Sequence, residues 1–409
     1  MFPSKLKKQR QIYLDHAAAT PIDQRVFAAM KPYLAKQFAN PSGLSRQSLA
    51  VRKAIDNARQ IIANFLGTQK DTIFFTSGGT ESINAAILGM AKGYMLDNKR
   101  FGHIITSEIE HHAVLEPIKS LEKQGWRVTY LKPNEKGVIG KEQVKGAIRK
   151  ETVLVSVMYA NNEIGTVEPI AEIGREILKW RKENNTQYPY FHTDACQATA
   201  YLDMHVEKLH VDLLSINGSK IYGPKGIGAL FVRRGVKIEP IIYGGGQEGG
   251  LRSGTENVAG IVGFGRAIEL ITKEQKIINK KQLELIEYFW QEIKKNIPEA
   301  KLNGSDIFSN KDKNYSRLPN NLNVSFVDIE AEALLFYLER YGVIASSGSA
   351  CSSVRDEVSH VLLACGKTEL EAKSTIRFTI GKETTKKDIN FVVKYLSLII
   401  KELHLINSI

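Results

Sequence analysis

Short apolar runs rich in β-branched and aromatic residues recur along the first part of the chain, and stretches with helical character separate most of them. Alternation of this kind predicts a mostly parallel sheet covered by helices. In such a sheet, ligand-binding groups gather at the ends of the strands. We therefore predict an α/β fold with a seven-stranded sheet, whose strands lie at residues 73–76, 103–106, 128–131, 153–158, 190–193, 211–216 and 229–232.

A second, smaller domain is expected after this sheet. The chain has 409 residues, which is more than one hydrophobic core usually covers. Beyond about Val258 the pattern changes to long charged helices with few strands, as in an α+β domain. The polar stretch 303–321 is expected to form a mobile surface loop. We predict a large domain over residues 16–262 and a small domain formed by residues 1–15 and 263–409.

Composition argues against several kinds of function. The formal net charge is +12, but the lysines are dispersed and no basic stripe interleaved with aromatic residues is present, so we expect an acidic protein partner and no direct nucleic-acid partner. No apolar stretch is long enough to span a membrane and the basic start lacks a signal-peptide core, which predicts a cytoplasmic protein. The cysteines show no metal-ligand spacing and suit a reducing compartment, and Cys196 and Cys365 are expected to be buried.

Two strand ends carry a lysine and an acid that point to one cofactor. Lys220 follows the strand at 211–216 in a glycine-bracketed turn, and Asp194 follows the strand at 190–193. A Schiff-base amine and a carboxylate that pairs with a pyridinium nitrogen are the side chains that pyridoxal phosphate requires. A third segment, residues 73–81, runs from a strand through two glycines into a helix, and the free N–H groups of a helix start suit a phosphate. Taken alone, such a glycine pair is also ordinary turn chemistry.

Together these segments resemble the cysteine desulfurases, a group of fold-type I pyridoxal phosphate enzymes in the class V aminotransferase family. Ordered matches run along nearly the whole chain, and the cysteine-containing segment narrows the resemblance to the desulfurases. The matching segments are residues 13–21, 40–42, 77–81, 110–114, 161–165, 192–197, 215–226, 252–255, 346–351 and 376–378.

The resemblance implies a role for each matching residue. Lys220 would bind the cofactor and then remove the substrate α-proton, and Asp194 would keep the pyridine nitrogen protonated. Arg377 would hold the α-carboxylate of L-cysteine, and Thr255 would reach the phosphate of the neighbouring subunit, which implies a homodimer. The remaining roles are stacking on the ring for His111, hydrogen bonds to the ring oxygen for Asn162 and Gln197, substrate binding for Asn162, and phosphate contacts for Gly79, Thr80 and Asn217 or Ser219.

Cys351 decides the reaction. It lies in a serine- and glycine-rich run, which is typical of a flexible loop, and a thiolate there can attack the sulfur of a cofactor-bound cysteine. A persulfide on the enzyme and free alanine would result. By resemblance, the sulfur would pass to an acceptor or scaffold protein for iron–sulfur cluster assembly or tRNA thiolation, and Cys351 is a candidate transient ligand of a cluster. No lysine or arginine lies closer to it than Arg355, so a lowered thiol pKa is not predicted.

The chain departs from the family pattern at three positions. Ser219 stands where many relatives have a histidine before the lysine, Asn217 replaces a common serine, and Ser45 replaces a histidine. A hydroxyl can still donate to a phosphate, so rate and acceptor preference are the properties left open. Two alternative functions remain: another class V aminotransferase or selenocysteine lyase, for which Cys351 would be dispensable, and a non-catalytic sulfur-transfer scaffold.

Overall fold

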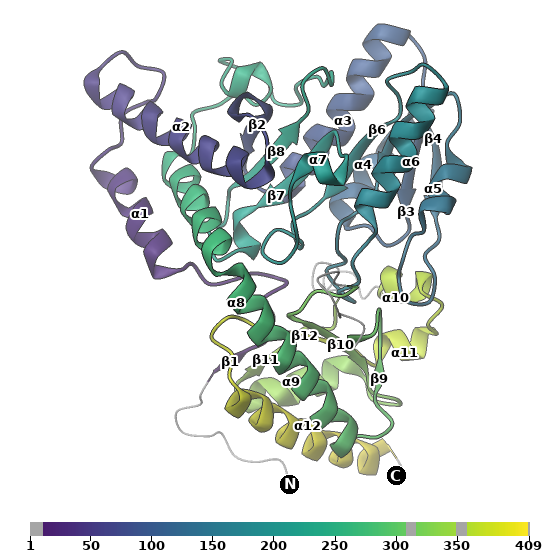
Figure 1. Ribbon diagram of the computed structural model, residues 1–409. Coiled ribbons are helices and arrows are strands. Elements are labelled where there is room, and N and C mark those ends of the chain that lie inside the picture. Colours follow the sequence, from purple (N-terminus) through teal and green to yellow (C-terminus); the bar gives the residue numbers. More distant parts are fainter. Residues whose placement is uncertain (1–10, 308–315, 349–357, 408–409) are drawn as a thin grey trace.

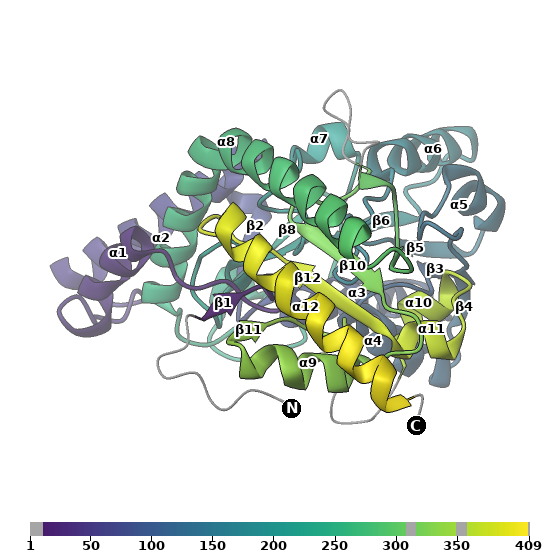
Figure 2. The same cartoon turned by 90° about the horizontal axis from the view of Figure 1, so that it is seen from below.

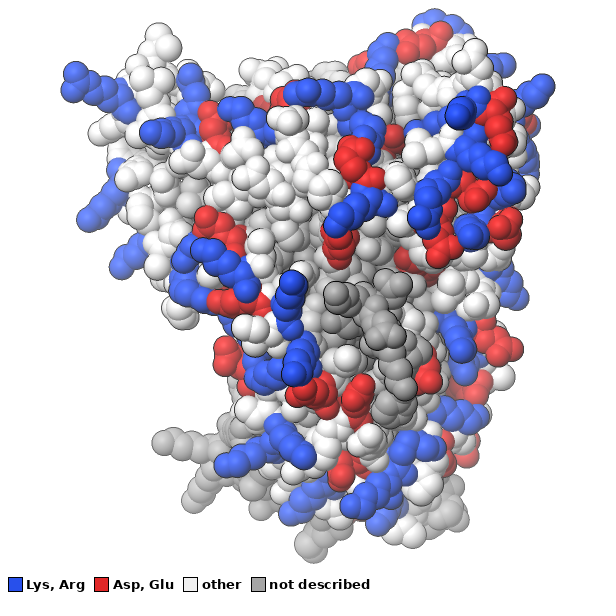
Figure 3. Space-filling view, in the orientation of Figure 1, with Lys and Arg blue, Asp and Glu red and all other residues white. Residues whose placement is uncertain are grey.

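The computed structural model describes residues 11–307, 316–348 and 358–407, in which a large α/β body lies above a smaller one in the view of Figure 1. Cys351 lies outside the described residues. On the face shown in Figure 3, Lys and Arg side chains are interspersed with Asp and Glu over both bodies. Among the described helices, none combines the length and the apolar character needed to cross a bilayer.

The large body contains the seven-stranded sheet that the alternation predicted. Its strand order is β2-β8-β7-β6-β5-β3-β4, and only β8 runs antiparallel to its neighbours. Predicted and observed strand ends agree to within two residues. The strands are β2 (Ile73–Thr76), β3 (His103–Ser107), β4 (Arg127–Leu131), β5 (Thr152–Ser156), β6 (Tyr190–Asp194), β7 (Leu213–Asn217) and β8 (Gly228–Val232).

Helices cover both faces of this sheet (Figure 1). All residues of the central strands β5, β6 and β7 are buried, as expected for strands covered on both sides. One face packs against α3 (Gly79–Asn98) and α4 (His112–Lys123). The other face packs against a core that includes residues of α1 (Gln24–Ala35), α2 (Arg46–Leu66), α5 (Lys141–Ala147), α6 (Ile170–Glu183), α7 (Val206–Leu209) and the first part of α8 (Val258–Asn296).

The small body has a separate hydrophobic core, which includes Ile12 and Leu14 from the N-terminal segment. Its antiparallel sheet has the order β12-β10-β9, and β1 pairs with β11 in a second, parallel sheet. Seen from below, α8 and α12 lie side by side across β10 and β12 (Figure 2). The elements are β1 (Ile12–Tyr13), β9 (Lys301–Leu302), β10 (Asn321–Ser325), β11 (Val343–Ile344), β12 (Thr375–Thr379), α9 (Ala331–Arg340) and α12 (Lys386–Asn407).

One continuous helix joins the two bodies. Phe264 and Ile271 of α8 belong to the core of the large body, whereas Ile286 and Phe289 belong to the core of the small body. The predicted domain boundary at residues 262–263 falls inside this helix and stays a prediction. Two short helices, α10 (His360–Ala364) and α11 (Glu369–Lys373), pack against the large body through a separate apolar cluster that includes Met158 and Ile164.

The expectation of a mobile surface loop over residues 303–321 is wrong for the described parts of that stretch. Asn303 and Arg317 are both 1% exposed. The Arg317 guanidinium donates to the carbonyl oxygens of Ser305 (2.7 Å) and Asn303. These polar residues are buried because they satisfy backbone acceptors of their own turn, which a polar composition does not reveal.

Candidate active site

A cavity of about 800 Å³ lies between the carboxyl ends of β6 and β7 and the start of α3. Strand ends of this kind are where open α/β sheets bind their ligands. The cavity brings together the predicted site residues Gly79, Thr80, His111, Asn162, Asp194, Gln197, Asn217, Ser219, Lys220 and Arg377.

Lys220 ends the 3₁₀ turn Gly218–Lys220 that follows β7. Its Nζ donates hydrogen bonds to the carbonyl oxygens of Ala17 (2.7 Å) and Ala18. Gln197 also donates to the Ala17 oxygen, at 3.0 Å from its Nε2. The N-terminal segment therefore forms a wall of the cavity and holds the amine in a defined position.

Asp194 ends β6 and is 7% exposed, and its Oδ1 accepts a hydrogen bond from the Cys196 amide at 2.9 Å. On the same strand, His192 lies fully buried between the hydroxyls of Ser156 (2.9 Å from Nδ1) and Ser215 (3.1 Å from Nε2). Burial lowers the pKa of His192 to about 3, so this imidazole is neutral. Its two hydrogen bonds tie β6 to β5 and β7 close to Asp194, a role that no sequence motif indicates.

The turn between β2 and α3, which the sequence analysis predicts to bind a phosphate, opens into the cavity. A Cβ atom on Gly79 would lie 2.7 Å from the Cys196 Sγ and 3.0 Å from Nδ2 of Asn217, so this position requires glycine. The first N–H groups of a helix have no intrahelical partners and attract anions. The Ser219 hydroxyl donates to Oδ1 of Asn217 at 3.4 Å, and both side chains line the cavity. Together with Lys220 and Asp194, these groups fit pyridoxal phosphate.

His111 is the N-cap of α4, and its Nδ1 accepts a hydrogen bond from the Ala113 amide at 3.0 Å. Burial lowers the pKa of His111, Lys220 lowers it further and Asp194 opposes the shift. The imidazole is therefore neutral near pH 7, and its cap bond fixes the plane of the ring. A neutral ring held in this way is suited to stack on an aromatic cofactor.

A further histidine pair lines the cavity. The rings of His112 and His360 lie 4.9 Å apart between centroids, and His360 Nε2 donates to the Glu110 carbonyl oxygen at 3.0 Å. The Glu110 side chain is fully buried, and its Oε1 accepts from the Ser107 hydroxyl at 2.7 Å. Burial raises the pKa of Glu110 to about 8. Ser107 and His360 lie in none of the segments that match the family, so the sequence analysis did not predict that they contribute to the site.

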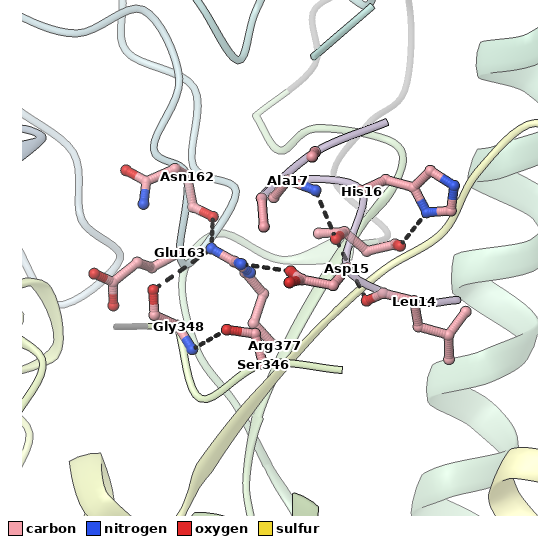
Figure 4. Close-up of polar contacts among 12 residues, drawn as sticks. Leu14, Asp15, His16, Ala17, Asn162, Glu163, Ser346, Gly348 and Arg377 are labelled. Atoms are coloured by element: carbon pink, nitrogen blue, oxygen red, sulfur yellow. Dashed lines mark hydrogen bonds and ion pairs between the residues drawn. The ribbon is translucent and has the colours of Figure 1, made fainter. Parts of the chain in front are cut away.

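Arg377 projects from β12 into the junction of the two bodies (Figure 4). Its side chain is 3% exposed, and its Nη2 lies 2.6 Å from Oδ1 of Asp15. Its Nη1 donates to the carbonyl oxygens of Asn162 (3.0 Å) and Gly348 (3.5 Å). Its Nε is buried and makes no hydrogen bond to the described residues. The ion pair with Asp15 was not predicted, because the partners are far apart in the sequence.

Thr255 does not line the main cavity but a neighbouring hollow of about 240 Å³, which shares Ser77, Gly226 and Ile227 with it. The neighbouring Arg252 donates from Nε to Oε1 of Glu81 at 2.9 Å, and Glu81 Oε2 accepts from the Ser77 amide at 2.9 Å. The segment that carries Thr255 is therefore anchored to the start of α3.

The two described cysteines are buried, as predicted. Burial raises the pKa of the Cys196 thiol well above its ordinary value and that of Cys365 to about 12, so both are neutral thiols. Within the part of the chain that the structure describes, no three or more His, Cys, Asp or Glu side chains are grouped to hold a metal ion.

This chain belongs to the aminotransferase class-V family, whose sequence profile matches residues 12–392. The class comprises pyridoxal phosphate enzymes, which the cavity fits, so the predicted cofactor is confirmed. Within the class, the chain is 47% identical to cysteine desulfurase IscS of Dictyoglomus turgidum, over 98% of this chain and 97% of the relative. It is 44% identical to cysteine desulfurase IscS of Methanosarcina thermophila, over 97% of this chain and 93% of the relative.

Solved structures of similar proteins also match this fold along nearly the whole chain. A NifS-like protein matches with a TM-score of 0.87 and 34% identity, over 96% of this chain and 100% of that one. A protein described as SspA in complex with cysteine matches with a TM-score of 0.75 and 37% identity, over 91% and 99% of the two chains. The predicted fold-type I architecture and the resemblance to the cysteine desulfurases are confirmed.

Proposed function

We propose that this chain is a cysteine desulfurase that converts L-cysteine to L-alanine and leaves the sulfur as a persulfide on Cys351. The observation that carries the proposal is one cavity that contains Lys220, Asp194, the glycine turn before α3 and Arg377. An amine, an acid, a phosphate cradle and a carboxylate anchor are the groups that such a reaction requires.

The residues of the large body bind the cofactor and move the proton. Bound pyridoxal phosphate supplies an electron sink for the negative charge that forms at the substrate α-carbon. Lys220 would hold the cofactor through Nζ, and the same atom would take the substrate α-proton. Asp194 would keep a proton on the ring nitrogen, and the neutral His111 would stack on the ring. Asn162 and Gln197 would orient the ring, while Gly79, Thr80, Asn217 and Ser219 would hold the phosphate.

Arg377 receives the substrate α-carboxylate. A buried donor without a partner costs about 1–3 kcal/mol, and the Arg377 Nε is such a donor among the described residues. A carboxylate oxygen at this position would remove that cost. Its Nη1 and Nη2 atoms donate to the carbonyl oxygens of Asn162 and Gly348 and to Asp15, so the side chain is oriented before the substrate arrives.

A homodimer completes the site in this proposal, with Thr255 on the phosphate of the neighbouring subunit. The position of Thr255 outside the main cavity of its own chain supports this assignment. Large apolar side chains are exposed on and after α1 and beside the Thr255 segment, as expected for a surface that another subunit covers. They are Phe27, Leu34, Phe38, Leu44, Leu49 and Tyr243.

Cys351 accepts the sulfur and passes it to an acceptor or iron–sulfur scaffold protein in the cytoplasm, for cluster assembly or tRNA thiolation. The neutral state of Cys196 and Cys365 supports this choice, because the thiolate is the nucleophile. The test is mass spectrometry of the protein after treatment with L-cysteine. We expect a sulfur adduct on the Cys351 peptide. Cys351→Ser should bind L-cysteine but release almost no alanine, and full alanine release by that variant would favour another class V activity.

A further inference from the structure

Glu163 lies close to the residues on either side of segment 349–357, which contains Cys351. Its side chain is buried, at 4% exposure, next to Asn162 in the cavity lining. Ser359 donates from its hydroxyl to Glu163 Oε2 at 2.5 Å. Gly348 approaches the same oxygen so closely that a Cβ atom on it would lie 3.0 Å away. Gly348 precedes residues 349–357 and Ser359 follows them, so one carboxylate oxygen binds Ser359 and leaves no room for a side chain at Gly348.

The backbone of Glu163 is itself held firmly. Its amide donates to Oδ1 of Asn161 at 2.8 Å. Its carbonyl oxygen accepts from Nδ2 of both Asn321 and Asn323, at 3.1 Å each. Asn161 belongs to the large body, whereas Asn321 and Asn323 belong to β10 of the small body. The backbone of Glu163 is therefore fixed to both bodies. A carboxylate on such a support can act as a rigid reference point.

Gly348 and Ser359, the residues on either side of the Cys351 segment, make further hydrogen bonds that hold them in place. Gly348 donates its amide to the Ser346 hydroxyl at 3.2 Å and accepts from Arg377, and it lies beside Glu163 in Figure 4. Gly348 has φ +89°, so this close approach requires glycine. Ser359 also caps α10, where its hydroxyl accepts from the Leu362 amide at 3.2 Å.

We propose that Glu163 is a positioning residue for sulfur transfer: its carboxylate binds Ser359 and packs close to Gly348, which restrains the two ends of the segment that presents Cys351 to the substrate sulfur. The proposal rests on the proposed function. In the step concerned, the Cys351 thiolate forms the S–S bond and the Cβ–S bond of the substrate breaks. The electron pair of that bond goes to Cβ, which takes up a proton, and the α-carbon regains the proton that Lys220 removed, which gives alanine. No external oxidant is needed.

The test separates two partial reactions in a single turnover of the holoenzyme. Mixing with L-cysteine changes the cofactor absorbance, which reports substrate binding and proton removal, and mass spectrometry follows the persulfide on the Cys351 peptide. Glu163→Asp keeps the charge but withdraws the carboxylate from its partners. We expect the absorbance change to keep its rate and amplitude, whereas persulfide formation falls about 100-fold, as for a reacting group misplaced by about 1 Å. A purely structural defect would slow both reactions.

Ser359→Ala removes one partner and should slow the same step, and the double variant should be no slower than the worse single variant, because both changes break one contact. Glu168→Gln is the matched control: Glu168 is also buried, accepts from the Ile139 amide at 2.8 Å and does not line the cavity. Persulfide formation within about twofold of wild type in folded Glu163→Asp, or a raised KM with unchanged kcat, would overturn the proposal. Cys351→Ser, measured in parallel, tests the proposed function separately.

Discussion

The two sides of the cavity are built in different ways. On the sheet side, Lys220 and Asp194 stand at the ends of adjacent strands, and short-range geometry sets their positions. On the other side, Arg377 is positioned by Asp15 and by the Asn162 carbonyl, which lie hundreds of residues away in the sequence. On the first side the sheet sets the backbone positions, and the N-terminal segment adds only the carbonyl oxygens that hold the Lys220 amine. The second side exists only when the two bodies and the N-terminal segment are assembled.

Substitutions on the two sides should therefore impair different properties of the enzyme. A change on the sheet side removes a chemical group from an otherwise intact site, so activity should fall without loss of fold. A change on the assembled side alters how the substrate is held, so binding constants and stability should respond. Variants on the two sides can therefore be distinguished by which quantity changes.

The largest effect is expected for Lys220→Ala, on the sheet side. The variant loses the amine that holds the cofactor and takes the α-proton, so turnover should fall at least about 10⁴-fold. The purified variant should lack the covalent link to the cofactor, which absorption spectroscopy and mass measurement detect. Lys225→Ala is the control, since Lys225 also lines the cavity and donates to the Thr20 carbonyl at 2.7 Å. Loss of the link in the control alone would refute the assignment.

A smaller effect is expected for Asp15→Asn, on the assembled side. Asn can still accept the hydrogen bond from Arg377, but the negative charge that competes with the substrate carboxylate is gone. The KM for L-cysteine and the inhibition constant of L-alanine should each fall by about tenfold, the effect of a moderately screened charge nearby. Steady-state kinetics measures both constants. An increase in KM would mean that Asp15 chiefly orients Arg377 and does not compete with the substrate.

The sequence predicted the sheet side well and the assembled side poorly. Strand periodicity and the glycine turns placed Lys220, Asp194 and Gly79 on one edge, because strand ends in one sheet meet by geometry. The contacts of Arg317 and of Asp15 depend on tertiary packing, which no local pattern encodes. His192 was missed for the same reason, since a buried histidine between two serines has no sequence signature.

The smallest effect concerns Glu110, whose carbonyl oxygen joins the two sides by accepting from His360. Burial raises its pKa from the ordinary value of 4.5 to about 8. Between these values the folded protein keeps the proton and the unfolded chain loses it, so stability is highest below the unfolded pKa and falls as pH rises toward about 8. Near neutral pH this loss is about 1 kcal/mol per pH unit at most.

Glu110→Gln should remove that pH dependence, because an amide oxygen can still accept from the Ser107 hydroxyl and the Met158 amide and does not ionise. Urea unfolding at about pH 6 and about pH 7 measures it: the wild type should lose about 1 kcal/mol more than the variant over this interval. Glu135→Gln, at an exposed site, should behave as the wild type. Equal losses in the wild type and Glu110→Gln would show that Glu110 is ionised in the folded protein, and that the junction of the two sides tolerates a buried charge.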